Sequence, residues 1–219
     1  MKTFVQHISE AGYLANPDHI KSVNQTMKKS GYKKLGRGQD ASVWGKEEGS
    51  VLKILTSGQS GFTHFYKFCK AHPNNPHLPK FPKISGQEYS EFTMDGEQYL
   101  QISIEKLKTI PRNSLAELSI WWFEDSVTKG KTFYEVVKEI QEIKQKTGGF
   151  SLKLIQEFQA ELQGSKRNDW LLLYSTIQAL STHMKKAKGL GWDLHTENAM
   201  MRSDGTVVIT DPFTDPSKW

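Results

Sequence analysis

The 219-residue sequence lacks the features that mark several classes of protein. Its single cysteine, Cys69, excludes an internal disulfide framework and suits a reducing cytoplasm. No apolar run approaches the roughly 20 residues that cross a bilayer, and residues 1–4 do not begin a signal-peptide core. We therefore expect a cytoplasmic protein that has no membrane partner.

The sequence also has little excess charge of either sign. Lysine and arginine number 29 against 24 aspartate and glutamate residues, which gives a net charge of +5, and the lysines are dispersed. This bias toward anionic partners is weak, so nucleic acid is not expected. With 37% hydrophobic residues the chain has an ordinary globular composition, and its length allows one domain or a bilobed unit. The oligomeric state cannot be deduced from these features.

The most informative stretch of the sequence is 190–213. Two short apolar runs, at 199–201 and 207–209, flank a polar turn that contains Asp204-Gly205. Aspartate and glycine tolerate the positive φ angles of a tight turn, so this pattern predicts a β-hairpin. The polar residues just outside the two runs would then lie close together.

Three oxygen-bearing side chains flank the predicted hairpin. Asn198 precedes its first strand, Asp211 follows its second, and Asp193 lies five positions before Asn198. Phosphoryl transfer needs such a group, because one carboxylate, here Asp193, orients the attacking hydroxyl. Two further oxygen donors, Asn198 and Asp211, would hold Mg²⁺ on the nucleotide phosphates. The alternative is an acidic surface hairpin whose polar residues only cap turns.

A glycine pattern precedes an apolar strand in the first quarter of the chain. Gly36, Gly38, Ala41 and Val43 follow the spacing Gly-x-Gly-x-x-Gly-x-Val, and the strand after them contains a lone Lys53. The glycine backbone would approach phosphates, Val43 would cover the base and Lys53 would reach the α- and β-phosphates. A ligand-free turn and an exposed edge-strand lysine are the alternatives. A dinucleotide fold is disfavoured because a strand, not a helix, follows the glycines.

The order of these parts resembles the protein-kinase-like fold over nearly the whole chain. The Asp-Leu-His-Thr-Glu-Asn form at 193–198 is similar to kinase-like small-molecule phosphotransferases and atypical kinases. More narrowly, three stretches resemble the short serine/threonine protein kinases of tailed bacteriophages. These stretches are 35–38, 60–69, and 193–198 together with Ile209-Thr210-Asp211-Pro212.

This resemblance implies an α+β fold with a β-rich N-lobe, residues 1–107, and a truncated helical C-lobe, residues 108–219. It implies a hinge in the N-lobe, where backbone groups of Glu105 and Leu107 would bind adenine. ATP and Mg²⁺ are the implied cofactors. The implied partners are host proteins, phosphorylated on serine or threonine in the host cytoplasm.

The sequence departs from typical kinases in two places. The helix expected over 61–72 has no acidic residue to pair with Lys53, so Asp211 and the phosphates, or Glu88 or Glu91, would take that place, or the site is catalytically weak. The chain also ends soon after the hairpin, without the usual peptide platform. A peptide substrate would then bind the helices expected over 113–164, or the substrate is not a peptide.

Three functions remain open at this point. The first is a protein kinase, the second a small-molecule phosphotransferase of the aminoglycoside- or choline-kinase kind, and the third a pseudokinase that acts by binding a host protein. A metal site formed by His183, His195 and Cys69 is disfavoured, because no short ligand spacing accompanies them. We expect His195 to support its loop through hydrogen bonds. Residues 170–184 are apolar nearly all round, which predicts a buried central helix.

Overall fold

The computed structural model describes residues 17–37, 41–46, 50–56, 60–83, 89–94 and 96–214. These residues form two compact units. The first contains the described residues up to Ser60 together with 79–108, and the second contains 61–78 with the described residues from Thr109 onward. An antiparallel sheet in the first and helices in the second confirm the α+β class. The lobe boundary expected between residues 107 and 108 stays a prediction. The compact units differ from it, because residues 61–78 belong to the same unit as the later residues.

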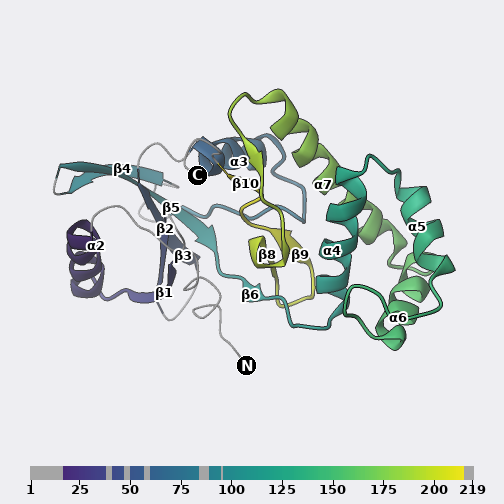
Figure 1. Cartoon of the computed structure of the whole chain (residues 1–219). Helices are drawn as coiled ribbons and strands as arrows, with labels where there is room; N and C mark the ends of the chain where they lie inside the picture. Colours follow the sequence, from purple (N-terminus) through teal and green to yellow (C-terminus); the bar gives the residue numbers. More distant parts are fainter. Residues whose placement is uncertain are drawn as a thin grey trace. The chain divides into compact units, whose positions relative to one another are not determined.

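The described residues of the first unit form a five-stranded antiparallel sheet and one helix (Figure 1). Its elements are α2 (Pro17–Lys29), β1 (Lys33–Arg37), β2 (Ala41–Gly45), β3 (Ser50–Thr56), β4 (Tyr89–Met94) and β5 (Glu97–Glu105). The strands lie in the order β1-β2-β3-β5-β4. Strand β3 lies at the centre of the sheet and pairs with β2 on one side and β5 on the other.

Helix α2 packs on one face of this sheet. Val23 and Met27, one helical turn apart, face the sheet because residues at i and i+4 share a helix side. The buried cluster that they enter contains four strand side chains, Trp44, Leu52, Ile54 and Tyr99. Strand side chains alternate between faces, so residues next to these in the sequence, Val43 and Lys53 among them, lie on the opposite face.

The second unit contains five helices and the predicted hairpin. Its helices are α3 (Ser60–Ala71), whose first residue belongs to the other unit, α4 (Leu115–Thr128), α5 (Phe133–Glu142), α6 (Leu152–Gln163) and α7 (Arg167–Lys186). After α7 come β7 (Gly191–Trp192), the 3₁₀ turn η1 (Thr196–Asn198), β8 (Ala199–Met201), β9 (Val207–Ile209) and β10 (Phe213–Thr214). The strands form a β10-β7 pair and a β6-β8-β9 sheet, in which β6 is Lys108–Thr109.

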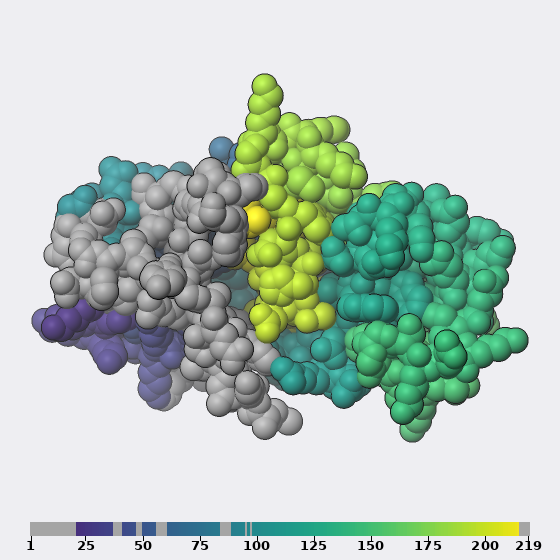
Figure 2. Space-filling model, viewed as in Figure 1, coloured from purple at the N-terminus to yellow at the C-terminus, as the bar shows by residue number. Residues whose placement is uncertain are grey.

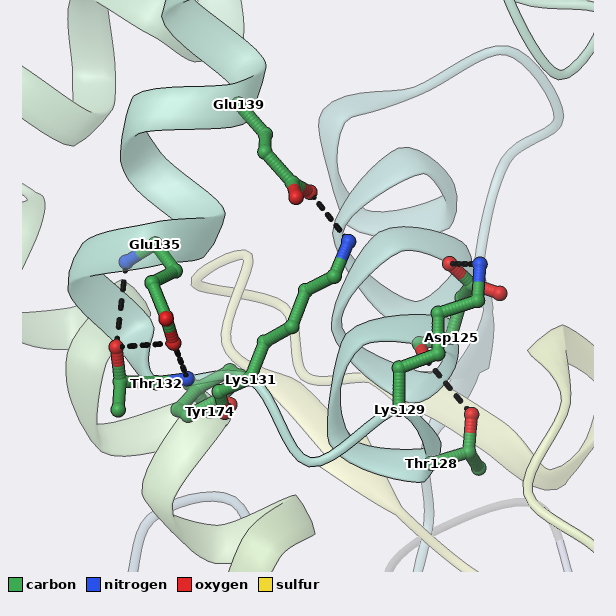
Figure 3. Close-up of polar contacts among 8 residues, drawn as sticks. All are labelled: Asp125, Thr128, Lys129, Lys131, Thr132, Glu135, Glu139 and Tyr174. Atoms are coloured by element: carbon green, nitrogen blue, oxygen red, sulfur yellow. Dashed lines mark hydrogen bonds and ion pairs between the residues drawn. The ribbon is translucent and has the colours of Figure 1, made fainter.

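Polar side chains cap the starts of α4, α5 and α6. Ser114 and Ser151 accept the N–H groups of Glu117 and Leu154 at the starts of α4 and α6. A capping box begins α5, since Thr132 and Glu135 bond to each other in both directions (Figure 3). The Tyr174 hydroxyl of α7 donates to the carbonyl of Lys131, so the start of α5 is tied to α7.

Helix α7 corrects one expectation. It was expected to be buried all round, but only one side of it is, through Leu173, Ile177 and Leu180. Leu171 and Leu172 on its other side are 40% and 41% exposed. The apolar composition of a helix does not distinguish a fully buried helix from one with an exposed side, because a folded protein leaves part of its apolar surface in water. No described helix is both long and apolar enough to cross a membrane.

Candidate functional site

The main chain of Asp193 is fixed by the β7–β10 pair. Trp192 pairs with Phe213, and the N–H of Asp193 donates to the carbonyl of Pro212 at 2.9 Å. Pro212 follows Asp211 directly, so this bond brings the main chains of the two aspartates side by side. Asp193 and Asp211 are separated in the sequence by the whole hairpin, and this backbone hydrogen bond holds their main chains together.

The β8–β9 hairpin places Asn198 beside Asp211. Ala199 pairs with Ile209, which confirms the predicted hairpin. The carbonyl of Asn198 accepts the N–H of Thr210 at 2.9 Å, the Thr210 hydroxyl at 3.0 Å and the N–H of Asp211 at 3.4 Å. The predicted convergence of Asp193, Asn198 and Asp211 is therefore present in the second unit.

The side chain of Asn198 bridges to Asp193. Its Nδ2 atom donates to the Asp193 carbonyl at 2.6 Å and to Asp193 Oδ2 at 3.0 Å. These acceptors define which end of the amide is nitrogen. All hydrogen bonds of the Asn198 side chain run through that nitrogen, so Oδ1 is the atom with which it would bind a cation.

His195 supports this loop, as expected from the sequence. Its Nδ1 accepts the N–H of Glu197 at 3.3 Å and caps η1. Its Nε2 lies 3.0 Å from Asn198 Nδ2 and 3.8 Å from Asp193 Oδ1. Asp193 and His195 keep 44% and 48% of their side chains exposed, and Figure 2 shows part of the stretch after α7, in yellow-green, at the surface. Solutes can therefore reach both side chains.

The charge on Asp193 is set by opposing effects. Burial raises the pKa of its carboxyl most strongly, and the nearby Asp211 carboxylate raises it further. His195 and the hydrogen bond from Asn198 lower the pKa in the opposite direction. The net effect is a raised pKa, so Asp193 accepts a proton more readily than an ordinary aspartate does.

The donor atoms present suit a hard cation. Asp211 offers a carboxylate and Asn198 an amide oxygen, and Mg²⁺ prefers oxygen ligands. Mg²⁺ is usually held by one or two carboxylates together with substrate phosphates, not by a cage of protein ligands. Within the described ranges there is accordingly no cluster of three or more His, Cys, Asp or Glu able to hold a metal. Cys69 is buried, which raises the pKa of its thiol and disfavours the thiolate that a metal needs.

Four of the predicted nucleotide-binding residues share one face of the first unit's sheet. Gly36 pairs with Val43, and Val43 pairs with Lys53, so all three lie on the face opposite α2. Ala41, two residues before Val43, lies on the same face. Lys53 is half-buried in β3. Gly38 lies outside the described residues.

The predicted hinge begins at the last residue of β5. The N–H of Glu105 donates to the carbonyl of Lys80 at 2.9 Å, so an adenine contact at Glu105 would use its carbonyl. Leu107 lies between β5 and β6. Of the two proposed replacements for the helix glutamate, Glu91 is exposed on β4 and Glu88 lies outside the described residues. Helix α3 has no acidic residue, as the sequence indicated.

Sequence reasoning missed two neighbours of the site. Thr210 bonds twice to the Asn198 carbonyl, and Glu124 of α4 accepts the indole N–H of Trp192 at 3.1 Å. Burial raises the pKa of Glu124, while the bond from Trp192 lowers it. In the sequence, Thr210 is distinguished only as a member of the 209–212 motif. Glu124 is 68 residues from Trp192 in the sequence, so no local pattern could reveal the contact.

Comparisons with known proteins show a distant structural similarity to kinases of small molecules. No family model and no curated protein sequence matches the chain. An amicoumacin kinase in complex with AMP-PNP, Ca²⁺ and its ligand aligns with 91% of this chain and 68% of its own, at 12% identity and a TM-score of 0.39. An aminoglycoside phosphotransferase from Alicyclobacillus acidocaldarius aligns with 92% of this chain and 67% of its own, at 12% identity and a TM-score of 0.35. A streptomycin–ATP complex of another such enzyme covers 94% of this chain and 74% of its own, at 14% identity and a TM-score of 0.29. Similarity this distant does not assign an activity.

Proposed function

We propose that the protein is an ATP- and Mg²⁺-dependent phosphotransferase acting on an alcohol. The supporting observation is the joining of Asp193, Asn198 and Asp211 through the Asn198 amide and carbonyl. In this proposal Asp193 orients the acceptor hydroxyl and takes its proton, for which its raised pKa is suited. Asn198 and Asp211 bind Mg²⁺, which supplies charge neutralisation at the phosphates.

The first unit would supply the nucleotide contacts. Lys53 would bind the α- and β-phosphates, and the segment 36–43, which contains Gly38 and Ala41, would cover them. The support is the shared sheet face of Gly36, Val43 and Lys53, because residues that contact one ligand must face the same way. Glu105 and Leu107 would hold adenine through their backbone groups.

Two classes of acceptor are proposed, a small molecule first and a protein second. The Asp-Leu-His form at 193–195 favours a small-molecule alcohol, and the distant structural neighbours, named as small-molecule kinases, point the same way without deciding it. The phage-kinase resemblance of 35–38, 60–69, 193–198 and 209–212 favours serine or threonine of a host protein. A pseudokinase would bind a protein and transfer nothing.

Labelled ATP distinguishes these functions. The purified chain is incubated with γ-labelled ATP and Mg²⁺, alone, with a bacterial lysate, and with its small-molecule fraction. Labelled metabolites support the first acceptor class and labelled proteins support the second. No transfer in any mixture would contradict the proposal.

The substitution Asp193→Asn tests the assigned role in the same assay. We expect transfer to fall by about 10²- to 10⁴-fold, because general base catalysis contributes an effect of that size. ATP binding should change little, since no phosphate contact is assigned to Asp193. Asp125→Asn, which removes an exposed carboxylate paired with Lys129, is the matched control. Transfer that persists in Asp193→Asn would show that this role is wrong.

A further inference from the structure

The segment Asn75–Leu78, which follows α3, closes the edge of the hairpin. Strand β9 is the last strand of its sheet, so its outer N–H and C=O groups need partners. The carbonyl of His77 accepts the N–H of Ile209 at 2.9 Å. The His77 ring pairs through Nδ1 with the carbonyl of Val207 at 2.8 Å. His77 therefore forms hydrogen bonds with two backbone groups of a three-residue strand.

Arg202, the residue directly after β8, binds the same segment. Its guanidinium donates to the carbonyl of Pro76 and, at 3.0 Å, to the carbonyl of Leu78. Two donors in a rigid plane fix the direction of these carbonyls as well as their distance. Arg202 also starts the hairpin turn, because its N–H donates to Thr206.

The segment is in turn fixed to α7. Asn75 accepts the N–H of His77 through Oδ1 at 2.9 Å and donates through Nδ2 to the Thr176 hydroxyl at 2.8 Å. Thr176 is 2% exposed and His77 is 5% exposed, so these bonds are shielded from water. The edge of β9 thus has a rigid support that does not belong to the hairpin itself.

We propose that His77 and Arg202 are positioning residues that hold Asn198 and Asp211 at the separation required to bind one divalent cation. The inference rests on the proposed function. Asn198 precedes β8 and Asp211 follows β9 at the same end of the hairpin. Strands of three residues have few pairing bonds, so opening of the β9 edge separates the two oxygen donors.

The ring of His77 has the protonation state that this role needs. A carbonyl only accepts, so Nδ1 donates its hydrogen to Val207. Burial lowers the pKa of His77 most strongly and the Arg202 charge lowers it too, while the hydrogen bond to the Val207 carbonyl and the nearby Asp169 raise it. The net lowering keeps the ring neutral near pH 7. The side-chain amide of glutamine is also a neutral donor, so it can replace the His77 ring in this hydrogen bond.

Metal affinity tests this inference. Mn²⁺ binding to the full chain is measured by electron paramagnetic resonance with a non-hydrolysable ATP analogue present, together with hydrogen exchange of residues 207–211. We expect Arg202→Gln and His77→Phe to weaken Mn²⁺ binding about tenfold or more, the size found when partners of metal ligands are removed. Exchange over 207–211 should rise in both variants. Arg112→Gln, an exposed arginine of the same unit, should match the wild type.

Conservative variants separate positioning from folding. His77→Gln retains a donor and should recover most of the Mn²⁺ affinity, and Arg202→Lys should fall between Arg202→Gln and the wild type, because lysine lacks the planar pair of donors. Folded variants with Mn²⁺ affinity within about twofold of the wild type overturn this inference alone. A wild-type chain that binds no Mn²⁺ overturns the proposed function and this inference with it.

Discussion

At the scale of the residue, Asn198 connects the parts of the candidate site. Its side chain donates to Asp193 and its carbonyl accepts from Thr210 and Asp211. The three polar residues were predictable because their spacing follows from one hairpin and one short loop. Their supports were not, since His77 lies 130 residues from Val207 and bonds to a carbonyl, a group that every residue has.

His183 gives a prediction about pH. Burial lowers its pKa, and the charges of His64, His72 and Lys186 add to this, so the fold favours the neutral ring. Stability is then fully present above the ordinary pKa of about 6.5 and is lost as the pH falls below it. The ring stacks on Phe213 and its Nε2 has no hydrogen bond, so His183→Phe keeps the shape without losing a bond. We expect the fall in Tm between pH 7.5 and 5.5 to be smaller in this variant. An unchanged pH dependence would contradict this.

At the scale of the element, local patterns predicted helices and hairpins well but not which element packs on which. The α5 capping box and the Asp204-Gly205 turn were predictable because three or four adjacent residues determine each of them. The exposed side of α7 was not predictable in this way. Nor was the packing of α3 against β10, which joins residues about 150 positions apart in the sequence.

Gly61 shows how closely α3 approaches β10. A Cβ atom at Gly61 would lie 2.8 Å from the carbonyl oxygen of Phe213. Alanine usually stabilises a helix relative to glycine, but here the backbone of β10 would have to move. We expect Gly61→Ala to lower the free energy of unfolding by about 1–3 kcal/mol in denaturant titrations. Lys67→Ala, on the exposed side of α3, should have little effect. A stabilised Gly61→Ala protein would contradict the close packing.

The start of α5 gives a second prediction at this scale. Thr132 accepts the N–H of Glu135 and bonds to its carboxylate (Figure 3). Thr132→Ala should lower the free energy of unfolding by about 1 kcal/mol, the usual effect of losing an N-cap. The control is Thr128→Ala, because that hydroxyl bonds to Asp125 at the exposed end of α4. Equal losses of unfolding free energy for the two substitutions in urea titrations would show that the cap contributes no more to stability than the Thr128 hydroxyl does.

At the scale of the whole molecule, the proposed function assigns the phosphate contact of Lys53 to the first unit and the cation ligands Asn198 and Asp211 to the second. The α+β class was predictable from strands that precede helices in the sequence. The grouping of 61–78 with the later residues was not, because membership of a compact unit depends on contacts between distant segments.

Ligand-induced stabilisation tests the contribution of the first unit. A ligand at about 100 times its Kd stabilises a fold by about 2.7 kcal/mol, so ATP analogue and Mg²⁺ should raise the Tm by about 5–10 °C. Lys53→Met should reduce this rise, because the proposed phosphate contact is lost. Lys67→Met replaces an exposed lysine and should retain it. An unchanged rise in Lys53→Met would exclude Lys53 from the nucleotide site.

The position of Trp192 allows the candidate site to be followed by intrinsic fluorescence. Its indole donates to Glu124, its backbone pairs with Phe213, and Asp193 is the next residue. Fluorescence emission of an indole responds to nearby charge and hydration. Replacing the other five tryptophans by phenylalanine would leave one intrinsic reporter, whose signal would follow ligands entering the loop in real time without an added dye.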